Sequence, residues 1–509
     1  MLSSQRKGFN SNMTKSRQLM MMAAVLAAGG VLGGCGGDSA KEQGAPEQQA
    51  SKAPAGPVAL SMMLTYSKPM PEAKDDPIKQ YLDQKLGTNL TISTYLPDDQ
   101  RTQLNVGLAS GSSADMFYVN RQDLVRLAKS NLLLDLTPYL DKLKPAVSYV
   151  GEGRLNLSTY NGKVYGIPQT ERAYQYSYWL RKDWLDKLNL QIPKTTEEFF
   201  NVAKAFAQQD PDGNGKNDTY GFSGRPTEAL GPLFGAYGTT YPGSFYIKEG
   251  KLVNSVYDPA MKDALAYIKR FFDEKIIDPD FLANTKLQHK DKAYQGQLGM
   301  FYFNWPNIKT DEYKKVNPAM DWVQIEVPAG PAGPGAYAKD MTASVLAFPK
   351  SIEKDKDKVE KIIELVNYSA SPEGSKVAMY GIKDKHYTEE NGAIKVTEVL
   401  AEPQGFAYQF VGRDEMVYLK TKFPDKEKEF VFASKQPFIS VYDSMITPPD
   451  GFVLGDAKRF IEEELWKFVN GKRDLATYGD FVAQLENTFK YKLYVQAAES
   501  QLKEQGILK

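Results

Sequence analysis

Short apolar runs alternate with helical segments near the start of the folded chain, and this alternation constrains the fold more than any other feature. The apolar runs cover 58–66, 89–95 and 114–119, and the helical segments between them cover 77–86, which stops at Gly87, and 98–110. Strand, helix, strand, helix, strand predicts a parallel sheet in an α/β lobe. Ligands of such sheets bind beyond the carboxyl ends of the strands.

The N-terminal segment ends at Cys35, the one cysteine of the chain. Four basic residues and no acid precede the apolar run 19–32. This order is typical of a secretory signal, and the run is shorter than the roughly 20 residues of a membrane span. The ending Leu32-Gly33-Gly34-Cys35 resembles the bacterial lipobox, which implies cleavage before Cys35 and lipid attachment to it. The alternative is a buried helix with an incidental thiol.

Residues 36–56 contain no large apolar residue, so we expect a flexible tether there. Residues 1–34 are then a lipoprotein signal peptide, and 35–56 are a lipidated tether. The resemblance to a lipobox implies a protein anchored by its lipid, palmitate included, to the outer face of the bacterial cell membrane.

Charge and cysteine content narrow the possible partners. The chain has 63 basic and 63 acidic residues, and loss of the four basic residues of the signal leaves about four net negative charges. With no basic block that could follow a phosphate backbone, we expect no nucleic-acid partner. A single cysteine allows no internal disulfide, so the core must hold without one. The 30 tyrosines suit sugar faces and hydroxyls, although tyrosine is also an ordinary core residue.

An oxygen-rich loop follows a helix that begins near Thr195. Thr195 and Glu198 have the spacing of a capping box, which explains the pair Glu197–Glu198 better than a catalytic role. In the loop, the spacing of an EF-hand calcium site is met by Asp210, Asp212, Asn214, Lys216 through its carbonyl, and Asp218. Position twelve is Gly221 instead of glutamate, and Thr219 stands where a last ligand could be. The alternative is a plain turn rich in Asp, Asn and Gly.

Four motifs then occur in order along the chain. They are Gly162-Lys-Val-Tyr-Gly-Ile-Pro168, Leu180-Arg-Lys-Asp-Trp-Leu-Asp-Lys-Leu188, Gly299-Met300 ahead of Trp305, and Ser371-Pro-Glu-Gly374. With the loop at Asp210 and the helical tail, the chain resembles a family 1 extracellular solute-binding lipoprotein of an ABC sugar importer, in the LipO-like and alginate-oligosaccharide-binding-like branch. The resemblance implies a two-lobed α/β fold of the periplasmic-binding-protein type, with crossover hinge strands and a ligand cleft between the lobes.

The resemblance also implies lobe boundaries and a metal. We expect the first lobe in 57–170 with about 346–400, and the second in 171–345 with about 401–509. Relatives in this branch bind calcium in such a loop without the glutamate at position twelve, so a structural calcium is expected here. The partners implied are an oligosaccharide and ABC permease subunits, and a monomer is expected.

Candidate ligand contacts come from strand ends and crossovers. They are Tyr66, Tyr118, Asn120, Arg172, Gln175, Trp305 and Tyr337. Trp305 follows the apolar strand 300–304 and precedes Pro306, so we expect it to leave the core and stack on a sugar ring; a core position is the alternative. Tyr66, Tyr118 and Asn120 follow strands, where packing at the edge of the core is an equal alternative.

The sequence offers little for catalysis. His289 and His386 lie in no zinc-binding spacing, no Gly-x-Ser-x-Gly elbow occurs, and lipidation removes the thiol. We therefore expect no enzyme, and predict capture of an oligosaccharide by lobe closure for delivery to an ABC transporter. The alternatives are an exported calcium-dependent polysaccharide-degrading enzyme and a surface sensor or adhesin lipoprotein.

Overall fold

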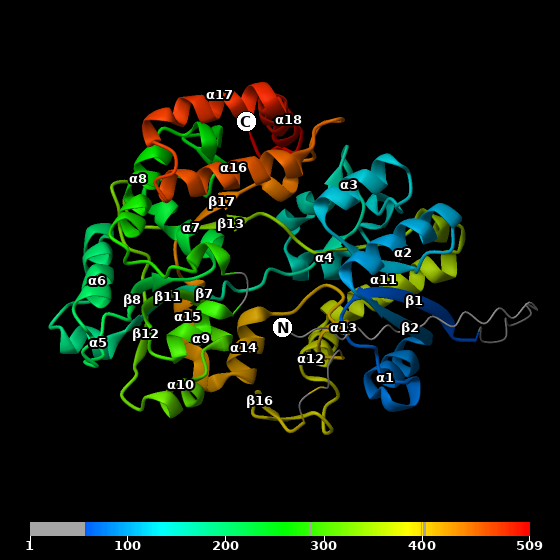
Figure 1. Ribbon diagram of the computed structural model, residues 1–509. Helices are drawn as coiled ribbons and strands as arrows, with labels where there is room; N and C mark the ends of the chain where they lie inside the picture. Colours follow the sequence, from blue (N-terminus) through cyan, green and yellow to red (C-terminus); the bar gives the residue numbers. More distant parts are fainter. Residues whose placement is uncertain (1–55, 285–286, 399, 401–403, 509) are drawn as a thin grey trace, which may run out of the picture. The chain divides into compact units, whose positions relative to one another are not determined.

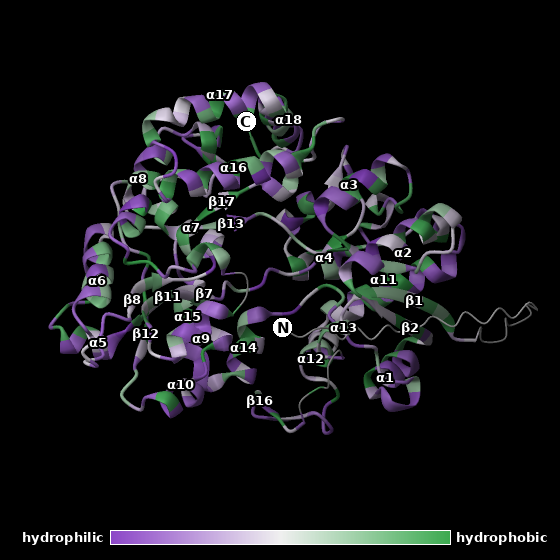
Figure 2. Ribbon diagram, viewed as in Figure 1, coloured by the Kyte–Doolittle hydropathy of each residue, from purple (hydrophilic) through white to green (hydrophobic). Residues whose placement is uncertain are grey.

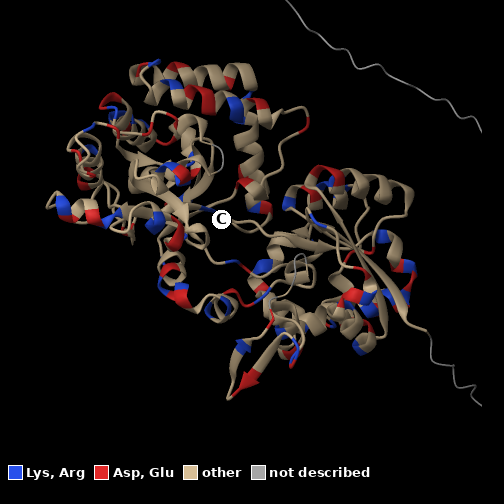
Figure 3. Ribbon diagram, turned by 60° about the horizontal axis from the view of Figure 1, so that its bottom comes forward, with Lys and Arg blue, Asp and Glu red and all other residues tan. Residues whose placement is uncertain are grey.

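The computed structural model describes residues 56–509 except 285–286, 399, 401–403 and 509 (Figure 1). The signal segment, Cys35 and nearly all of the tether lie outside the described residues. None of the helices in the described part is long and apolar enough to cross a membrane. Basic and acidic residues are mixed along the helices rather than separated by sign (Figure 3).

The first sheet has five strands in the order β2-β1-β3-β14-β6. Its strands are β1 (Val58–Thr65), β2 (Thr88–Tyr95), β3 (Met116–Val119), β6 (Ile167–Pro168) and β14 (Val345–Ala347). β1 pairs in parallel with β2 and β3, as the sequence predicts, and β14 joins antiparallel to β3 and β6. The carboxyl ends of β1 and β3 therefore share one edge.

Helices pack on this sheet and complete the first lobe. They are α1 (Pro77–Leu86), α2 (Pro97–Ser110), α3 (Arg121–Lys129), α4 (Lys144–Val150), α11 (Lys356–Ala370), α12 (Pro372–Tyr380) and α13 (Gln404–Ala407). Gly87 ends α1 with a φ of 62°, the left-handed conformation that glycine adopts most easily. Ser371 caps α12 by accepting from the Gly374 amide, and Pro372 occupies the first turn.

Two further sheets build the second lobe. One has the order β12-β7-β11-β8 and the other the order β10-β9-β17-β13. Their strands are β7 (Tyr176–Arg181), β8 (Tyr220–Ser223), β9 (Phe245–Lys248), β10 (Lys251–Asn254), β11 (Leu298–Asn304), β12 (Trp322–Ile325), β13 (Tyr337–Asp340) and β17 (Phe438–Val441). β11 is buried along nearly its whole length, so its apolar sequence reflects burial on both faces. The helices of the molecule carry both hydrophilic and hydrophobic residues along their length in Figure 2.

The second lobe has many helices. They are α5 (Lys182–Lys187), α6 (Thr196–Gln208), α7 (Pro226–Ala236), α8 (Ala260–Asp273), α9 (Gln288–Tyr294), α10 (Thr310–Val316), α14 (Glu415–Lys422), α15 (Glu427–Ser434), α16 (Leu454–Val469), α17 (Tyr478–Phe489) and α18 (Tyr491–Glu504). The capping box at α6 is confirmed, since Thr195 accepts from the Glu198 amide and Glu198 accepts from the Thr195 amide. The helical tail is confirmed as well, and α16 ends before Asn470-Gly471 as expected. Two hairpins, β4 (Thr159–Tyr160) with β5 (Lys163–Val164) and β15 (Tyr387–Glu390) with β16 (Ala393–Val396), stand apart from the sheets.

One expected boundary shifts. The sequence assigns 401–509 to the second lobe, but Ala407, Tyr408, Phe410 and Val411 belong to the same core cluster as the strands of the first sheet. The buried phenol of Tyr408 also hydrogen-bonds Asp76 at 2.5 Å. The chain therefore leaves the first core after Val411 and not near residue 400.

Candidate functional site

Three short segments connect the first sheet with the second lobe, and they are called crossovers below. They are residues 169–175 between β6 and β7, residues 341–344 between β13 and β14, and residues 412–414 ahead of α14. Their backbones are hydrogen-bonded together. The Gln169 amide donates to the Ser344 carbonyl at 2.9 Å, and the Thr170 amide donates to the Val411 carbonyl at 2.9 Å. The crossovers thus form one connected hinge region.

An aromatic cluster lies where the first crossover enters β7. The rings of Tyr174 and Tyr337 are stacked, with centroids 3.5 Å apart and planes 7° apart. Tyr174 also shares a 2.6 Å hydrogen bond with the hydroxyl of Tyr302. Tyr176 lies 5.8 Å from Tyr302, and Phe438 lies 5.8 Å from Tyr337. Tyr302 and Tyr337 are each 3% exposed, whereas Tyr174 and Tyr176 are half-buried and Phe438 is 48% exposed. The accessible part of the cluster therefore consists of Tyr174, Tyr176 and Phe438.

The alternation Tyr174-Gln-Tyr176-Ser-Tyr178 explains the cluster locally. Side chains two apart on an extended chain point to the same side, so these three tyrosines line up beside β11. Tyr178 sits opposite Tyr302 in the strand register. Burial raises the pKa values of Tyr174 and Tyr337, that of Tyr337 to about 12, which keeps both phenols neutral and able to donate.

Charged pairs surround the aromatic cluster. Glu171 on the first crossover forms ion pairs with Lys339 of β13 and, at 3.8 Å, with Arg154. The Lys339 ammonium also lies 4.4 Å from the centre of the Phe438 ring. Arg225 and Glu228 pair at 2.6 Å, and burial raises the pKa of Glu228. The surroundings of the rings therefore offer both donors and acceptors.

A pocket of about 490 Å³ lies at the shared carboxyl edge of β1 and β3. Its walls include Thr65, Gln100, Tyr118, Asn120 and the second crossover at 342–344. The Tyr118 hydroxyl donates to the Gln409 carbonyl at 3.1 Å and accepts from the Gln169 amide group at 3.1 Å. The pocket is thus tied to the crossovers, and its location at the strand ends matches the prediction for a parallel sheet.

The predicted contact residues divide into two groups. Tyr118 and Asn120 line this pocket, although Asn120 also caps α3 by accepting from the Asp123 amide at 2.8 Å. Arg172 lies on the first crossover, exposed, with Nη2 3.4 Å from the Gln409 side-chain oxygen. Tyr337 belongs to the aromatic cluster.

The remaining predicted residues lie elsewhere in the hinge or beside it. Tyr66 is half-buried, with its ring centre 5.8 Å from that of Phe406, which is 39% exposed. Gln175 is half-buried, and its backbone carbonyl accepts from the Trp305 amide at 3.0 Å. The structure does not bring either of them into the pocket at the edge of β1 and β3.

The expectation that Trp305 leaves the core is wrong. Its side chain is 1% exposed and packs against Phe423 and Phe430, with ring centres 5.6 and 5.5 Å away. Pro306 lies in a short turn, but the end of α14 and helix α15 cover the strand end. No local signal predicts that these helices return there. Trp305 is therefore not available to stack on a ligand.

Sequence reasoning missed several residues at the hinge. Tyr174 and Tyr176 could have been found from the alternating tyrosines, and Gln169 from its place right after β6. Phe406 and Phe438 had no such signal, because only the fold brings them beside Tyr66 and Tyr337.

The loop after α6 gathers the predicted oxygen ligands. The Asp210 carboxylate accepts from the amides of Gly213, Asn214 and Gly215, each at 3.0 Å. The Asn214 amide group contacts both Asp212 at 2.8 Å and Asp218 at 3.1 Å. Burial, followed by the hydrogen bond to Asp210, raises the pKa of Asp212. Over the described residues, no group of three or more His, Cys, Asp or Glu side chains has the arrangement of a metal site.

The glycine at loop position twelve has a packing reason. A Cβ on Gly221 would lie 2.1 Å from the carbonyl oxygen of Ala203, because β8 passes close to α6. A glutamate therefore does not fit at position 221. The loop differs from an EF-hand at this position because β8 packs closely against α6.

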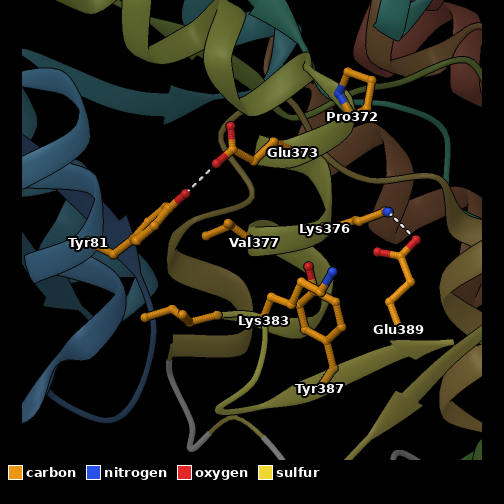
Figure 4. Close-up of a pocket in the computed structure, with 9 residues that line it drawn as sticks. Tyr81, Pro372, Glu373, Lys376, Val377, Lys383, Tyr387 and Glu389 are labelled. Atoms are coloured by element: carbon orange, nitrogen blue, oxygen red, sulfur yellow. Dashed lines mark hydrogen bonds and ion pairs between the residues drawn. The ribbon is translucent and has the colours of Figure 1, made fainter.

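A different pocket, of about 390 Å³, opens between α1, α12 and β15 (Figure 4). Four of its polar side chains form two pairs with one another. Tyr81 donates to Glu373 at 2.5 Å, and Lys376 pairs with Glu389 at 2.7 Å. None of the predicted contact residues lines it.

Comparison with known proteins gives a consistent result. A family model described as bacterial extracellular solute-binding protein matches residues 77–383. The polygalacturonan/rhamnogalacturonan-binding protein YtcQ of Bacillus subtilis is 29% identical over 380 residues, covering 73% of this chain and 74% of that protein. The lipoprotein LipO of the same organism is 25% identical over 445 residues, covering 80% of this chain and 86% of that protein.

Solved structures share the fold. FusA of Streptococcus pneumoniae, an ABC-transporter substrate-binding protein solved with kestose, has a TM-score of 0.65 and 20% identity, over 88% of this chain and 99% of FusA. FusA has also been solved as an EF-hand mutant. The alginate-binding protein AlgQ2, solved without calcium ion, has a TM-score of 0.63 and 17% identity, over 88% of this chain and 98% of AlgQ2.

Proposed function

This chain belongs to the bacterial extracellular solute-binding proteins, and from that premise we propose that it captures an oligosaccharide and delivers it to an ABC importer. YtcQ and FusA, which the chain resembles, are named for sugar polymers or oligosaccharides. The chemistry of the hinge region supports the same ligand class.

The observation that carries this proposal is the aromatic cluster at the crossovers. Sugars present C–H faces and rings of hydroxyls, so their sites combine aromatic rings with hydrogen-bonding groups. Here the half-buried rings of Tyr174 and Tyr176 and the exposed ring of Phe438 supply the apolar faces. The buried ring of Tyr337 stacks against Tyr174 and holds it in place. Arg172, Asn120 and the charged pairs nearby supply donors and acceptors.

The mechanism we propose is closure of the two lobes on the sugar. A ligand that contacts both lobes favours the closed arrangement by its differential affinity for it, and the permease recognises that form. The lobes would move relative to one another about the three crossovers. The pocket at the edge of β1 and β3 lies on the side of the first lobe, and the aromatic cluster lies on the side of the second. The sugar is bound and released intact, which fits relatives that are named as binding proteins.

A calcium ion is the proposed structural cofactor of the loop 210–218. The donor set fits a hard cation: carboxylates of Asp210, Asp212 and Asp218, the side-chain oxygen of Asn214, and the Lys216 carbonyl. Burial and the hydrogen bond to Asp210 raise the pKa of Asp212, and the nearby charges of Asp218 and Asp210 add to this; a bound cation would favour the charged form of all three carboxylates. The ion would stabilise the loop between α6 and β8, so its role would be structural and not catalytic.

We also propose that Cys35 is lipidated and anchors a monomer at the outer face of the cell membrane. The lipobox-like ending supports this, as does the similarity to the lipoprotein LipO. An anchor with the tether 36–56 would keep the binding lobes close to the permease.

The lobes are proposed to be 57–168 with 345–411, and 176–340 with 415–508.

A thermal-shift screen of the purified protein tests the proposed function. Oligosaccharides of different backbones, including oligogalacturonides and fructo-oligosaccharides, would be compared with amino acids and short peptides. Because a ligand that binds only the folded state raises Tm, at least one oligosaccharide is expected to do so. A shift with peptides alone would contradict the proposal.

A further inference from the structure

A pocket with walls from both lobes lies away from the aromatic cluster. Its volume is about 660 Å³. The first lobe contributes α3 and the segment 156–162, and the second contributes Thr447 and the end of α18. The residues that line it are Arg121, Val125, Lys129, Asn156, Thr159, Tyr160, Asn161, Gly162, Thr447, Gln501, Glu504 and Gln505.

Arg121 is buried in the wall of this pocket without an acidic partner. Its side chain is 2% exposed, and no carboxylate in the described part of the chain forms an ion pair with it. Nη1 donates to the Thr159 carbonyl, while Nε has no hydrogen-bond partner. A buried guanidinium without a counter-charge is costly, and it is usually paired with a carboxylate or phosphate. Burial lowers the pKa of Arg121 to about 10, which leaves it charged at neutral pH.

A second polar atom of the pocket lining also lacks a partner. The side-chain oxygen of Gln505 is buried and has no hydrogen-bond partner among the described residues. Lys129 is exposed at the edge, with its ammonium 5.9 Å from the centre of the Tyr160 ring. Glu504 is the one acid in the lining. The set therefore combines two cations with amides, hydroxyls and one aromatic face.

We propose that this pocket is a second ligand site, for a sugar that carries one acidic group. The unpaired Arg121 would bind the anion, with Lys129 adding to the positive potential. The amides of Asn156, Asn161 and Gln505 would bind hydroxyls. A volume of about 660 Å³ is far more than an inorganic ion needs and lies within the range of small-molecule pockets.

Occupation of this pocket would couple to the position of the lobes, because its walls come from both. The two lobes already meet beside it, where Gln122 Nε2 donates to the Ile446 carbonyl at 3.3 Å. A ligand held by Arg121 on one side and α18 on the other changes the balance between lobe arrangements by its differential affinity. None of the residues of this pocket belongs to the aromatic cluster, so the site is separate from the proposed oligosaccharide site.

Isothermal titration calorimetry with four probes tests the proposal: galacturonate, glucose 6-phosphate, galactose and acetate. At least one acidic sugar is expected to bind at least tenfold more tightly than galactose and acetate. The two acidic sugars separate a carboxylate from a phosphate source. Binding of galactose as tight as that of both acidic sugars, or no binding of either acidic sugar, would overturn the proposal.

Variants locate the bound sugar. Lys129→Glu is exposed and should fold, and it is expected to weaken acidic-sugar binding at least tenfold. Arg121→Gln should abolish binding if it folds. Lys356→Glu makes the same charge change at an exposed position of α11 outside the pocket and should stay within twofold of wild type. Equal affinity of Lys129→Glu and wild type would refute the site whatever the behaviour of Arg121→Gln.

Failure of this site leaves the proposed function untouched. Neutral oligosaccharides test the aromatic cluster, and small acidic sugars test the Arg121 pocket. A protein that binds the first and not the second retains the importer function and lacks the second site.

Discussion

Tyr174 stacks on Tyr337, with ring centres 3.5 Å apart and planes 7° apart. Tyr174 belongs to the first crossover, and Tyr337 begins β13, which leads directly into the second. The stack therefore joins two of the covalent connections between the lobes. The position of the Tyr174 ring is therefore linked to the arrangement of the two crossovers.

Removal of the Tyr174 ring should weaken sugar binding. Tyr174→Ala deletes both the stack and the 2.6 Å hydrogen bond to Tyr302, and it is expected to reduce affinity at least tenfold in calorimetry. Tyr174→Phe keeps the ring and should lose no more than about fivefold, since a net hydrogen bond contributes only about 1 kcal/mol. Equal affinities of Tyr174→Ala and wild type would exclude the cluster as the binding surface.

Trp305 should act on stability and not on binding. Trp305→Ala leaves a cavity beside Phe423 and Phe430, and such changes cost about 3–5 kcal/mol of unfolding free energy. Chemical denaturation measures this loss. At a temperature where the variant is folded, its sugar affinity should stay within twofold of wild type, and a larger loss would place the indole in the site after all.

The loop at Asp210 should make stability depend on calcium. Removal of calcium with a chelator is expected to lower Tm, and calcium but not magnesium at equal concentration should restore it, because several oxygen ligands suit the larger ion. Asp212→Asn should show a reduced response. A control, Asp450→Asn, lies outside the loop and should respond like wild type. A wild-type Tm unaffected by chelator and by added calcium would contradict the metal site.

Asp443 should make the fold less stable at higher pH. Burial raises the pKa of Asp443 to about 7, while an unfolded aspartate ionises near pH 4. The folded state therefore holds a proton that the unfolded state releases, so stability falls as pH rises from about 4 to 7 and stays lowered above that. Asp340 nearby adds to the raised pKa, and Lys458 opposes it.

Thermal unfolding at pH 5 and pH 8 measures this effect. Asp443→Asn should reduce the difference in Tm between the two pH values, since an amide does not titrate. Asp450→Asn, at an exposed position, should leave the wild-type difference unchanged. If the wild-type protein were more stable at pH 8 and Asp443→Asn showed the same pH dependence, the raised pKa of Asp443 would be contradicted.

Local signals in the sequence account for much of the fold. The strand–helix alternation from Val58 to Val119 predicted three parallel strands and two helices, and the caps at Thr195 and Ser371 marked helix starts that the structure confirms. These features depend on neighbouring residues, so a sequence contains them directly.

The candidate site could be predicted only in part. Tyr118 and Asn120 lie at the end of a strand that was recognisable from the sequence, and both line the pocket at that edge. The prediction that Trp305 leaves the core was wrong because its burial depends on α14 and α15, which come more than a hundred residues later in the chain. Phe438 and Gln409 were missed for the same reason, since their nearness to the hinge comes from long-range packing.

Calorimetric titration of the wild-type protein with the oligosaccharide that raises its Tm most, followed by mass spectrometry of the recovered sugar, tests the central claim most directly. The account predicts saturable binding of one sugar per protein and recovery of the sugar at its original mass. No saturable binding of any oligosaccharide, or recovery of shortened products, would contradict it.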